Sequence, residues 1–306
     1  MNYLTEINRL KKEKNAVILA HCYQNVEVDE VADYVGDSLY LSRMASKTDA
    51  DIIIFAGVYF MAQTAKILNP SKKVILPDIN AGCDMADMIN LKQLREFKTQ
   101  NPEIPVVCYI NSTAEVKSEC DICCTSSNAV QIVDSLNAEK VLFLPDKNLG
   151  RWVEKQLKNV EVITYDGYCP IHNNYSPDSI EKTKNKYPKA LVLAHPECRE
   201  EFLDKADYVG STTGIMNYVK NSPEKEFIIA TESGVIERLQ RDYPQKLFRN
   251  IDDKPAVCKS MKLINIAEIY NALKNETPEI HVDKEIAEKA LKCIQRMLDV
   301  SSAGVK

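Results

Sequence analysis

The sequence repeats one pattern of apolar runs, helices and cysteines three times, and this repeat constrains the fold more than any other feature. Short apolar runs alternate with segments of helical periodicity, which is typical of α/β units around parallel sheets. Nine runs form three sets of three: 17–23, 52–57, 74–78, 106–112, 141–146, 162–166, 191–197, 227–232 and 247–251. Each set predicts a strand, a Ser/Thr-rich helix start, a helix, a strand, a helix, a strand and a loop with a cysteine.

Three kinds of landmark give the same period for the repeat. The first strands start at Val17, Val106 and Leu191. The helix starts are Ser38, Ser126 and Ser211. The cysteines after the third strands are Cys83, Cys169 and Cys258. Members of each set lie 85 to 89 residues apart, a longer period than solenoid repeats have. We therefore predict an α/β protein of three similar α/β/α units with parallel sheets, related by a pseudo-threefold axis. The units are expected at residues 1–86, 87–172 and 173–260, and C-terminal helices over 261–306 are expected to pack on the other units.

Local signals predict several further helices. The first residues form a short charged amphipathic pattern. Asn90 can cap a helix, and Ser176 followed by Pro177 is a strong helix start. Asp283 is expected to cap the final helix, and residues 261–273 are expected to form one helix that links the third unit to this tail. His281, in a linker, is expected at the surface.

The charge balance argues against a polyanionic partner. The 39 Lys and Arg residues are outnumbered by 44 Asp and Glu, giving a net charge of -5, so the chain lacks the basic field that binds nucleic acid. No apolar run approaches the length needed to span a bilayer, and the first residues lack the apolar core of a signal peptide. We expect a cytoplasmic protein without nucleic-acid or membrane partners.

Ten cysteines are many for a cytoplasmic chain of 306 residues, where thiols are more often metal ligands or catalytic groups than disulfides. Cys22, Cys108 and Cys293 lie in apolar patterns and are interpreted as buried core residues. The motif Cys120-x-x-Cys123-Cys124 resembles a metal or redox motif, but it has no matching second pair in the sequence. We interpret it as structural or incidental, with a zinc half-site as the alternative.

Reactive side chains follow the predicted strands, where parallel α/β sheets bind their ligands. The first strands end at His21 and Tyr23, at Tyr109 and Asn111, and at His195 and Glu197; the third strands are followed by Cys83, by Cys169 with His172, and by Cys258. If these ends converge, three thiolates point at one centre. Three thiolates on a 4Fe-4S cluster leave one iron open as a Lewis acid. Spacing alone matches no compact ligand motif, and only the repeat distinguishes these cysteines.

Two further groups have both a structural and a functional interpretation. Ser or Thr at three helix starts in phase indicates a phosphate or carboxylate site, although ordinary N-capping explains any single one. The histidines at strand ends favour substrate binding or acid/base work, and Pro196 holds Glu197 in extended geometry as a candidate base. Tyr23 and Tyr109 could equally be core aromatic residues.

The motifs, taken in order, resemble those of the quinolinate synthase family over nearly the whole chain. They are HCYQ (21–24), GDSL (36–39), AGCDMA (81–86), YINST (109–113), CTSSNA (124–129), PDKNLG (145–150), GYCPIH (167–172), HPEC (195–198), GSTTG (210–214), TESG (231–234) and AVCKSM (256–261).

The resemblance implies a 4Fe-4S cluster held by three cysteines with one open iron, and the condensation of iminoaspartate with dihydroxyacetone phosphate to quinolinate in de novo NAD biosynthesis. It also implies functional coupling to an L-aspartate oxidase or an aspartate dehydrogenase. The implied roles are cluster ligation by Cys83, Cys169 and Cys258; substrate binding by His21, Ser38, Asn111, Ser126, His172, Ser211 and Thr212; and catalysis by Tyr23, Tyr109, His195 and Glu197. The extra threonine of GSTTG leaves open whether Thr212 or Thr213 contacts phosphate.

Two other functions remain open on the sequence alone. One is a cluster-dependent hydro-lyase that acts on a simple hydroxy acid with the same open iron. The other is a binding module, either an iron-sulfur electron carrier or a zinc-stabilised scaffold.

Overall fold

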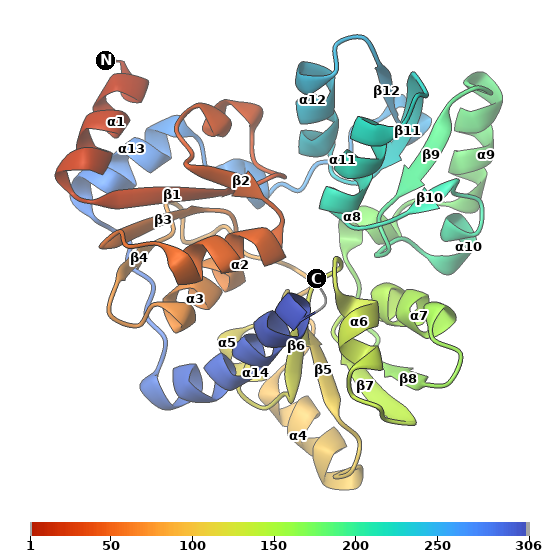
Figure 1. The fold of residues 1–306 in the computed structure, drawn as a ribbon, viewed down its shortest axis with the longest axis horizontal. Coiled ribbons are helices and arrows are strands. Elements are labelled where there is room, and N and C mark those ends of the chain that lie inside the picture. The colour runs from red at the N-terminus through yellow and green to blue at the C-terminus, as the bar shows by residue number, and fades with distance from the viewer. Residues whose placement is uncertain (1, 304–306) are drawn as a thin grey trace.

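A computed structural model describes residues 2–303, and its core consists of three four-stranded sheets. All strands within each sheet are parallel. The strand order is the same in each sheet: β2-β1-β3-β4, β6-β5-β7-β8 and β10-β9-β11-β12. Figure 1 shows the three sheets, with their helices, arranged around a common centre. The prediction of three similar α/β units is confirmed.

Each sheet is flanked by helices from its own part of the chain. The first part contains α1 (Tyr3–Glu13), β1 (Ala16–His21), η1 (Val26–Glu30), β2 (Tyr34–Gly36), α2 (Ser38–Lys47), β3 (Ile52–Ala56), α3 (Tyr59–Leu68) and β4 (Lys73–Ile75). The second contains α4 (Leu91–Gln100), β5 (Val106–Tyr109), α5 (Ala114–Lys117), β6 (Ile122–Cys124), α6 (Ala129–Asp134), β7 (Lys140–Leu144), α7 (Lys147–Gln156), β8 (Glu161–Thr164) and α8 (Pro170–Asn173).

The third part repeats this order of elements and leads into the C-terminal helices. It contains α9 (Pro177–Lys186), β9 (Leu191–Ala194), α10 (Glu200–Leu203), β10 (Tyr208–Val209), α11 (Thr212–Asn221), β11 (Glu226–Ala230), α12 (Ser233–Asp242), β12 (Leu247–Asn250), η2 (Ile251–Asp253) and η3 (Met261–Leu263). The last helices are α13 (Ile266–Asn275) and α14 (Lys284–Ala303).

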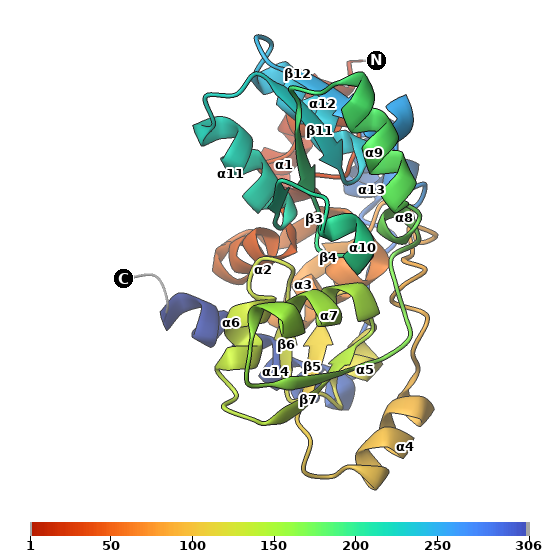
Figure 2. The ribbon, with the colours of Figure 1, turned by 90° about the vertical axis from the view of Figure 1, so that its right-hand side faces the viewer.

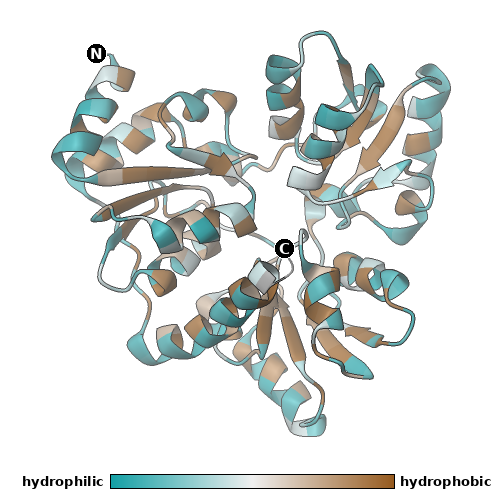
Figure 3. Ribbon diagram, viewed as in Figure 1, coloured by the Kyte–Doolittle hydropathy of each residue, from teal (hydrophilic) through white to brown (hydrophobic). Residues whose placement is uncertain are grey.

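The central strands form the hydrophobic core. Every residue of β3 is buried, as are all but the first residues of β1 and β11, which explains why these strands appear as continuous apolar runs in the sequence. Figure 3 shows hydrophobic strands inside helices whose outer faces are hydrophilic. Because the strands of each sheet are parallel, the loops after them emerge at the same edge of that sheet.

Each sheet has one more strand than the sequence pattern predicts. The additional strands β2, β6 and β10 are only two or three residues long and lie directly before the Ser/Thr-rich segments. Segments this short are below the length at which periodicity identifies a strand. Cys123 and Cys124 lie in β6 and not in a loop.

The C-terminal segment differs from the prediction in one place. A single helix was expected over 261–273, but the structure has η3 and α13, separated by Ile264 and Asn265, and the Asn265 side chain caps α13. Helix α13 packs on α1 and β3, and α14 contacts α3, α5, α6 and β6. Figure 2 shows α14 beside α6 and β6. The two C-terminal helices therefore contact elements that belong to the first and the second sheets.

The predicted caps are present. Asn90 forms a capping box with Gln93, and Ser176 accepts a hydrogen bond from the amide of Ser179 ahead of α9. Asp283 Oδ1 accepts hydrogen bonds from two amides of the first turn of α14. His281 is exposed, as expected. Among residues 2–303 no helix has both the length and the apolar character needed to cross a membrane.

Candidate active site

One cavity brings together residues that follow strands of all three sheets. It contains thirteen of the fourteen side chains that the sequence singled out: His21, Tyr23, Ser38, Cys83, Tyr109, Asn111, Ser126, Cys169, His172, His195, Glu197, Thr212 and Cys258. The remaining residue, Ser211, is not part of the lining, and its Oγ accepts a 3.1 Å hydrogen bond from the Gly214 amide at the start of α11. The convergence follows from the fold, since parallel strands in each sheet end at the same edge.

The three cysteines of the repeat reach the cavity from equivalent loops. Cys83 follows β4, Cys169 is the residue before α8, and Cys258 lies between η2 and η3. Burial raises the pKa of the Cys83 thiol to about 12, and the nearby thiol of Cys258 acts in the same direction. Burial also raises the pKa of Cys169 and Cys258. A cation bound among these sulfurs would displace their protons.

Two acidic residues hold the backbone of these cysteine loops. Asp146, which caps α7, accepts a 3.2 Å hydrogen bond from the amide of Cys169. Glu232, which caps α12, accepts a 3.3 Å hydrogen bond from the amide of Cys258. The equivalent residue before α3 is Val58, which cannot accept such a bond. Helix capping and cysteine placement are thus coupled in the second and third units.

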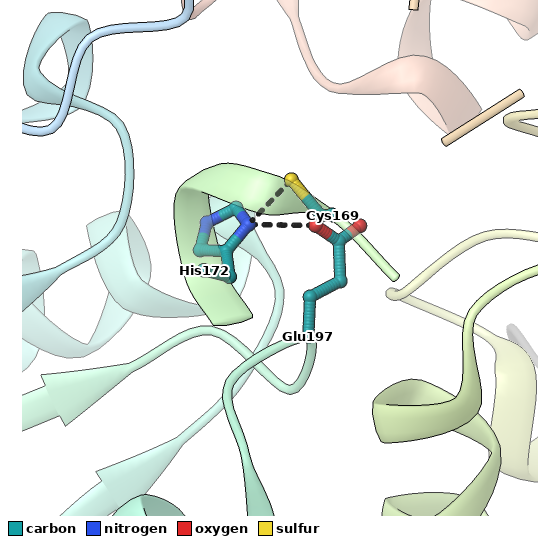
Figure 4. A group of neighbouring side chains, drawn as sticks. All are labelled: Cys169, His172 and Glu197. Carbon is teal, nitrogen blue, oxygen red and sulfur yellow. Dashed lines mark hydrogen bonds and ion pairs between the residues drawn. The ribbon is translucent and has the colours of Figure 1, made fainter. Parts of the chain in front are cut away.

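Cys169, His172 and Glu197 meet at one wall of the cavity (Figure 4). His172 Nδ1 lies 2.7 Å from Glu197 Oε2 and 3.3 Å from Cys169 Sγ. The donor atoms of the three residues all lie within 4.8 Å of one another, which also makes them a candidate group for a single metal ion. Because a carboxylate only accepts hydrogen bonds, the short contact places the proton of His172 on Nδ1.

The other nitrogen of His172 joins a chain of hydroxyl groups. His172 Nε2 lies 2.9 Å from Thr231 Oγ1, which lies 2.9 Å from the hydroxyl of Tyr23. The Tyr23 hydroxyl is also 3.0 Å from Thr212 Oγ1. With Nδ1 protonated, Nε2 accepts the Thr231 proton, and Thr231 in turn accepts the proton of Tyr23. Thr231 therefore fixes the orientation of two cavity residues that the sequence identified.

Burial and neighbouring charges determine the protonation states in the cavity. Burial lowers the pKa of His21 to about 4. The charges of Arg238 and Lys262 act in the same direction, whereas those of Asp37 and Glu197 oppose the shift. Burial also lowers the pKa of His195 to about 3. Both rings are therefore neutral at pH 7. For Glu197, burial acts to raise the pKa, but the charges that His195 and His172 carry when protonated, and the hydrogen bonds from His172 and the Tyr109 hydroxyl, lower it below its usual value, so the group is a carboxylate.

Asp37 connects the three helix starts. Asp37 caps α2, and its Oδ2 accepts hydrogen bonds from Ser127 Oγ at 2.8 Å and from Thr213 Oγ1 at 2.6 Å. The residue before α2, the turn before α6 and the first turn of α11 thus meet at one carboxylate. In the GSTTG motif, Thr212 lines the cavity while Thr213 makes this link.

The three predicted helix starts differ in detail. Ser38 is the first residue of α2, and Ser211 is the cap of α11. Ser126 was expected to start a helix, but α6 begins at Ala129, and Ser126 lies in the preceding turn with its Oγ 3.2 Å from His195 Nε2. The turn forms because Asn128 Oδ1 accepts hydrogen bonds from the amide and the hydroxyl of Thr125.

Sequence reasoning missed four residues that shape the site: Asp37, Asp146, Thr231 and Glu232. All four lie in motifs that carry the family resemblance, namely GDSL, PDKNLG and TESG. An acidic residue one position before a helix is a capping signal, and it could have identified Asp37 and Asp146. Nothing local distinguishes Thr231. Cys120, Cys123 and Cys124 do not line the cavity.

Comparison with known proteins shows the family of the chain. The family model described as "Quinolinate synthetase A protein" matches residues 5–299. The quinolinate synthase of Alkaliphilus metalliredigens is 50% identical over 299 residues, covering 98% of each chain. Those of Thermodesulfovibrio yellowstonii and Aquifex aeolicus are 46% and 48% identical, covering 97% of this chain and 98% and 93% of theirs. The chain therefore belongs to the quinolinate synthetase A family.

Proposed function

We propose that this chain is a quinolinate synthase. It condenses iminoaspartate with dihydroxyacetone phosphate and forms quinolinate, phosphate and water for de novo NAD biosynthesis. The family membership and the names of the relatives support this activity. The observation that carries the proposal is the meeting, in one cavity, of three cysteines from equivalent loops with the buried carboxylate of Glu197 and three histidines.

The donor set fits a 4Fe-4S cluster. Cys83, Cys169 and Cys258 would hold it, because thiolates are its usual ligands and these three side chains line one cavity. With three protein ligands, one iron would lack a protein ligand, and it would supply Lewis-acid chemistry.

The surrounding side chains suit an anionic substrate and proton transfer. The cavity lining, within residues 2–303, contains no Lys or Arg, so phosphate and carboxylate groups would be bound by backbone amides at the starts of α2 and α11 and by hydroxyl groups. Ser38, Ser126 and Thr212 supply those hydroxyl groups. Asn111 also has a buried Oδ1 without a partner among the described residues, which a substrate donor would satisfy.

Glu197 is the best-placed general base. It is ionised, buried and oriented by Tyr109 and His172, so it can remove a proton from substrate carbon or nitrogen. His195, neutral and hydrogen-bonded to Ser126, and Tyr23 would position the intermediate and return protons. His21, neutral and buried at the end of β1, would bind a substrate carboxylate.

The proposed substrates indicate the setting of the enzyme. An imine hydrolyses readily in water, so iminoaspartate has to be supplied by a nearby reaction, and an L-aspartate oxidase or an aspartate dehydrogenase would do so. All ten cysteines are free thiols in the structure. A chain with this many thiols and an iron-sulfur cluster is suited to a reducing compartment, so we place it in the cytoplasm.

An anaerobic assay tests the proposed function. The purified protein is incubated with iminoaspartate generated in place, with and without dihydroxyacetone phosphate. We expect quinolinate and inorganic phosphate in equal amounts, only when both substrates are present. Dehydration of a simple hydroxy acid with no need for dihydroxyacetone phosphate would instead identify a hydro-lyase. Stoichiometric zinc without iron would contradict both enzymes and favour a scaffold.

A further inference from the structure

Four cysteines outside the cavity converge in the core of the second unit. Cys108 lies on β5, Cys120 precedes β6, Cys123 lies on β6 and Cys293 lies on α14. The sulfur atoms of Cys123 and Cys293 are 3.2 Å apart. Cys108 and Cys123 are paired in register on neighbouring strands, so their side chains share one face of the sheet, whereas Cys124 points to the other.

The motif Cys120-x-x-Cys123-Cys124 thus lies beside Cys108 and Cys293, which were interpreted from the sequence as core residues. Cys108, Cys123 and Cys293 are indeed buried. They are not arranged as a metal site. The one group of three ligand side chains with mutual distances within 4.8 Å, among the described residues, is the cavity group that contains His172.

A buried lysine accompanies the thiols. The Lys117 ammonium donates a hydrogen bond to the carbonyl of Ser112 and has no carboxylate partner within residues 2–303. Burial lowers the pKa of Lys117, and the neighbouring thiols oppose this shift. Burial would raise the pKa of the Cys108 thiol. Hydrogen bonds with Cys120 and Cys123, together with the charge of Lys117, instead hold that pKa well below its usual value.

We propose that Cys123 and Cys293 are a disulfide-forming pair, and that Cys120 and Cys108 relay thiol exchange to this pair from the surface. A disulfide needs two sulfur atoms about 2 Å apart, and these two are in contact without a bond. Both are almost fully buried, so an oxidant cannot reach them directly. Cys120 is the one member of the group that is partly exposed, and Cys108 is in hydrogen-bond contact with both Cys120 and Cys123.

The exchange is balanced with a small-molecule disulfide such as oxidised glutathione as oxidant. Burial and the neighbouring Cys108 raise the pKa of Cys120, so Cys120 attacks a glutathione sulfur as it passes its proton to the Cys108 thiolate, and one reduced glutathione is released. Cys108 attacks Cys120 and releases the second. Cys123 then attacks Cys108 and frees Cys120, and Cys293 attacks Cys123 and frees Cys108. Two protein thiols lose two protons and two electrons, and one glutathione disulfide becomes two thiols.

The product would join the C-terminal helix covalently to the sheet of the second unit. Helix α14 also carries Ser301, whose hydroxyl lies 2.7 Å from Asn128 Nδ2, and Asn128 organises the turn that contains Ser126. The bond would therefore fix the helix that supports one wall of the cavity.

Peptide mapping tests this pair without depending on catalysis. The anaerobically purified, cluster-containing protein is incubated with oxidised glutathione, quenched in acid, alkylated and digested. We expect a peptide that joins Cys123 to Cys293 in most chains. A glutathione adduct on Cys120 as the only product, a different disulfide, or unmodified thiols would each overturn the proposal.

Matched variants separate the pair from the relay. Cys293→Ala should abolish the linked peptide, and Cys124→Ala, on the same strand but the other face, should leave it unchanged. Cys120→Ser should slow formation at least about tenfold without changing the final yield. An unchanged rate in Cys120→Ser would exclude the relay. If Cys293→Ala fails to fold, the peptide map of the unsubstituted protein still decides.

Discussion

The Tyr109 hydroxyl donates a 2.5 Å hydrogen bond to Glu197 Oε1, joining the last residue of β5 to a residue that lies 88 positions later, in the loop after β9 of another sheet. The other oxygen of Glu197 contacts His172. Both carboxylate oxygens are thus held, and the group is fixed beside Cys169 at the wall of the cavity. Such second contacts orient a catalytic carboxylate before substrate arrives.

The first prediction concerns Glu197. Glu197→Gln keeps the size of the side chain but removes the charge, so we expect normal iron content and a loss of turnover of about 10²-fold or more, as for removal of a general base. Anaerobic kinetics and iron analysis measure both quantities. Glu237→Gln, on α12 and outside the cavity, is the matched control. A normal rate in Glu197→Gln would remove this residue from the catalytic group.

A second prediction concerns Thr231 as a positioning residue. Thr231→Val removes the hydroxyl that orients Tyr23 and His172, and we expect kcat to fall about tenfold with little change in KM, because the substrate is not contacted directly. Thr231→Ser retains the hydroxyl and should restore most of the rate. Equal loss in the two variants would show that packing, and not the hydrogen bonds, is responsible.

The third prediction is a pH dependence of stability through His21. Its pKa is about 4 in the folded chain and about 6.5 in an unfolded chain, so only the unfolded state gains a proton between these values. Stability is therefore complete above pH 6.5 and decreases as the pH falls towards 4.

Urea unfolding at pH 7 and pH 5, under reducing conditions, measures this effect. We expect the unsubstituted protein to lose about 1–2 kcal/mol more than His21→Gln over this interval. His281→Gln, at an exposed position, should behave like the unsubstituted protein. Identical losses in the unsubstituted protein and His21→Gln would contradict the assigned protonation state.

The repeat allowed much of the fold and site to be predicted, because equivalent positions of a triplicated unit must lie at equivalent places. The phase of Cys83, Cys169 and Cys258 placed all three in one cavity, although their spacing matches no ligand motif. Their role as cluster ligands stays a prediction, as do the residue boundaries of the units. Strand ends likewise located Tyr23 and Tyr109, which line the cavity and do not act only as core aromatic residues.

Contacts between units could not be predicted in this way. Asp37 accepts hydrogen bonds from Ser127 and Thr213, which lie 90 and 176 positions away, and no local period encodes such a meeting. The same applies to Cys123 and Cys293, 170 positions apart. Short strands were missed for a different reason, since β10 has only two residues and burial of its neighbours determines its conformation.

Metal analysis with electron-paramagnetic spectroscopy decides whether the three cysteines of the repeat hold one iron-sulfur cluster. We expect about four iron per chain in the anaerobically purified protein, and loss of the cluster in each of Cys83→Ser, Cys169→Ser and Cys258→Ser. Cys198→Ala, beside Glu197 but outside the cavity lining, should retain it. A full cluster in any of the three serine variants, or zinc in place of iron, would contradict the account.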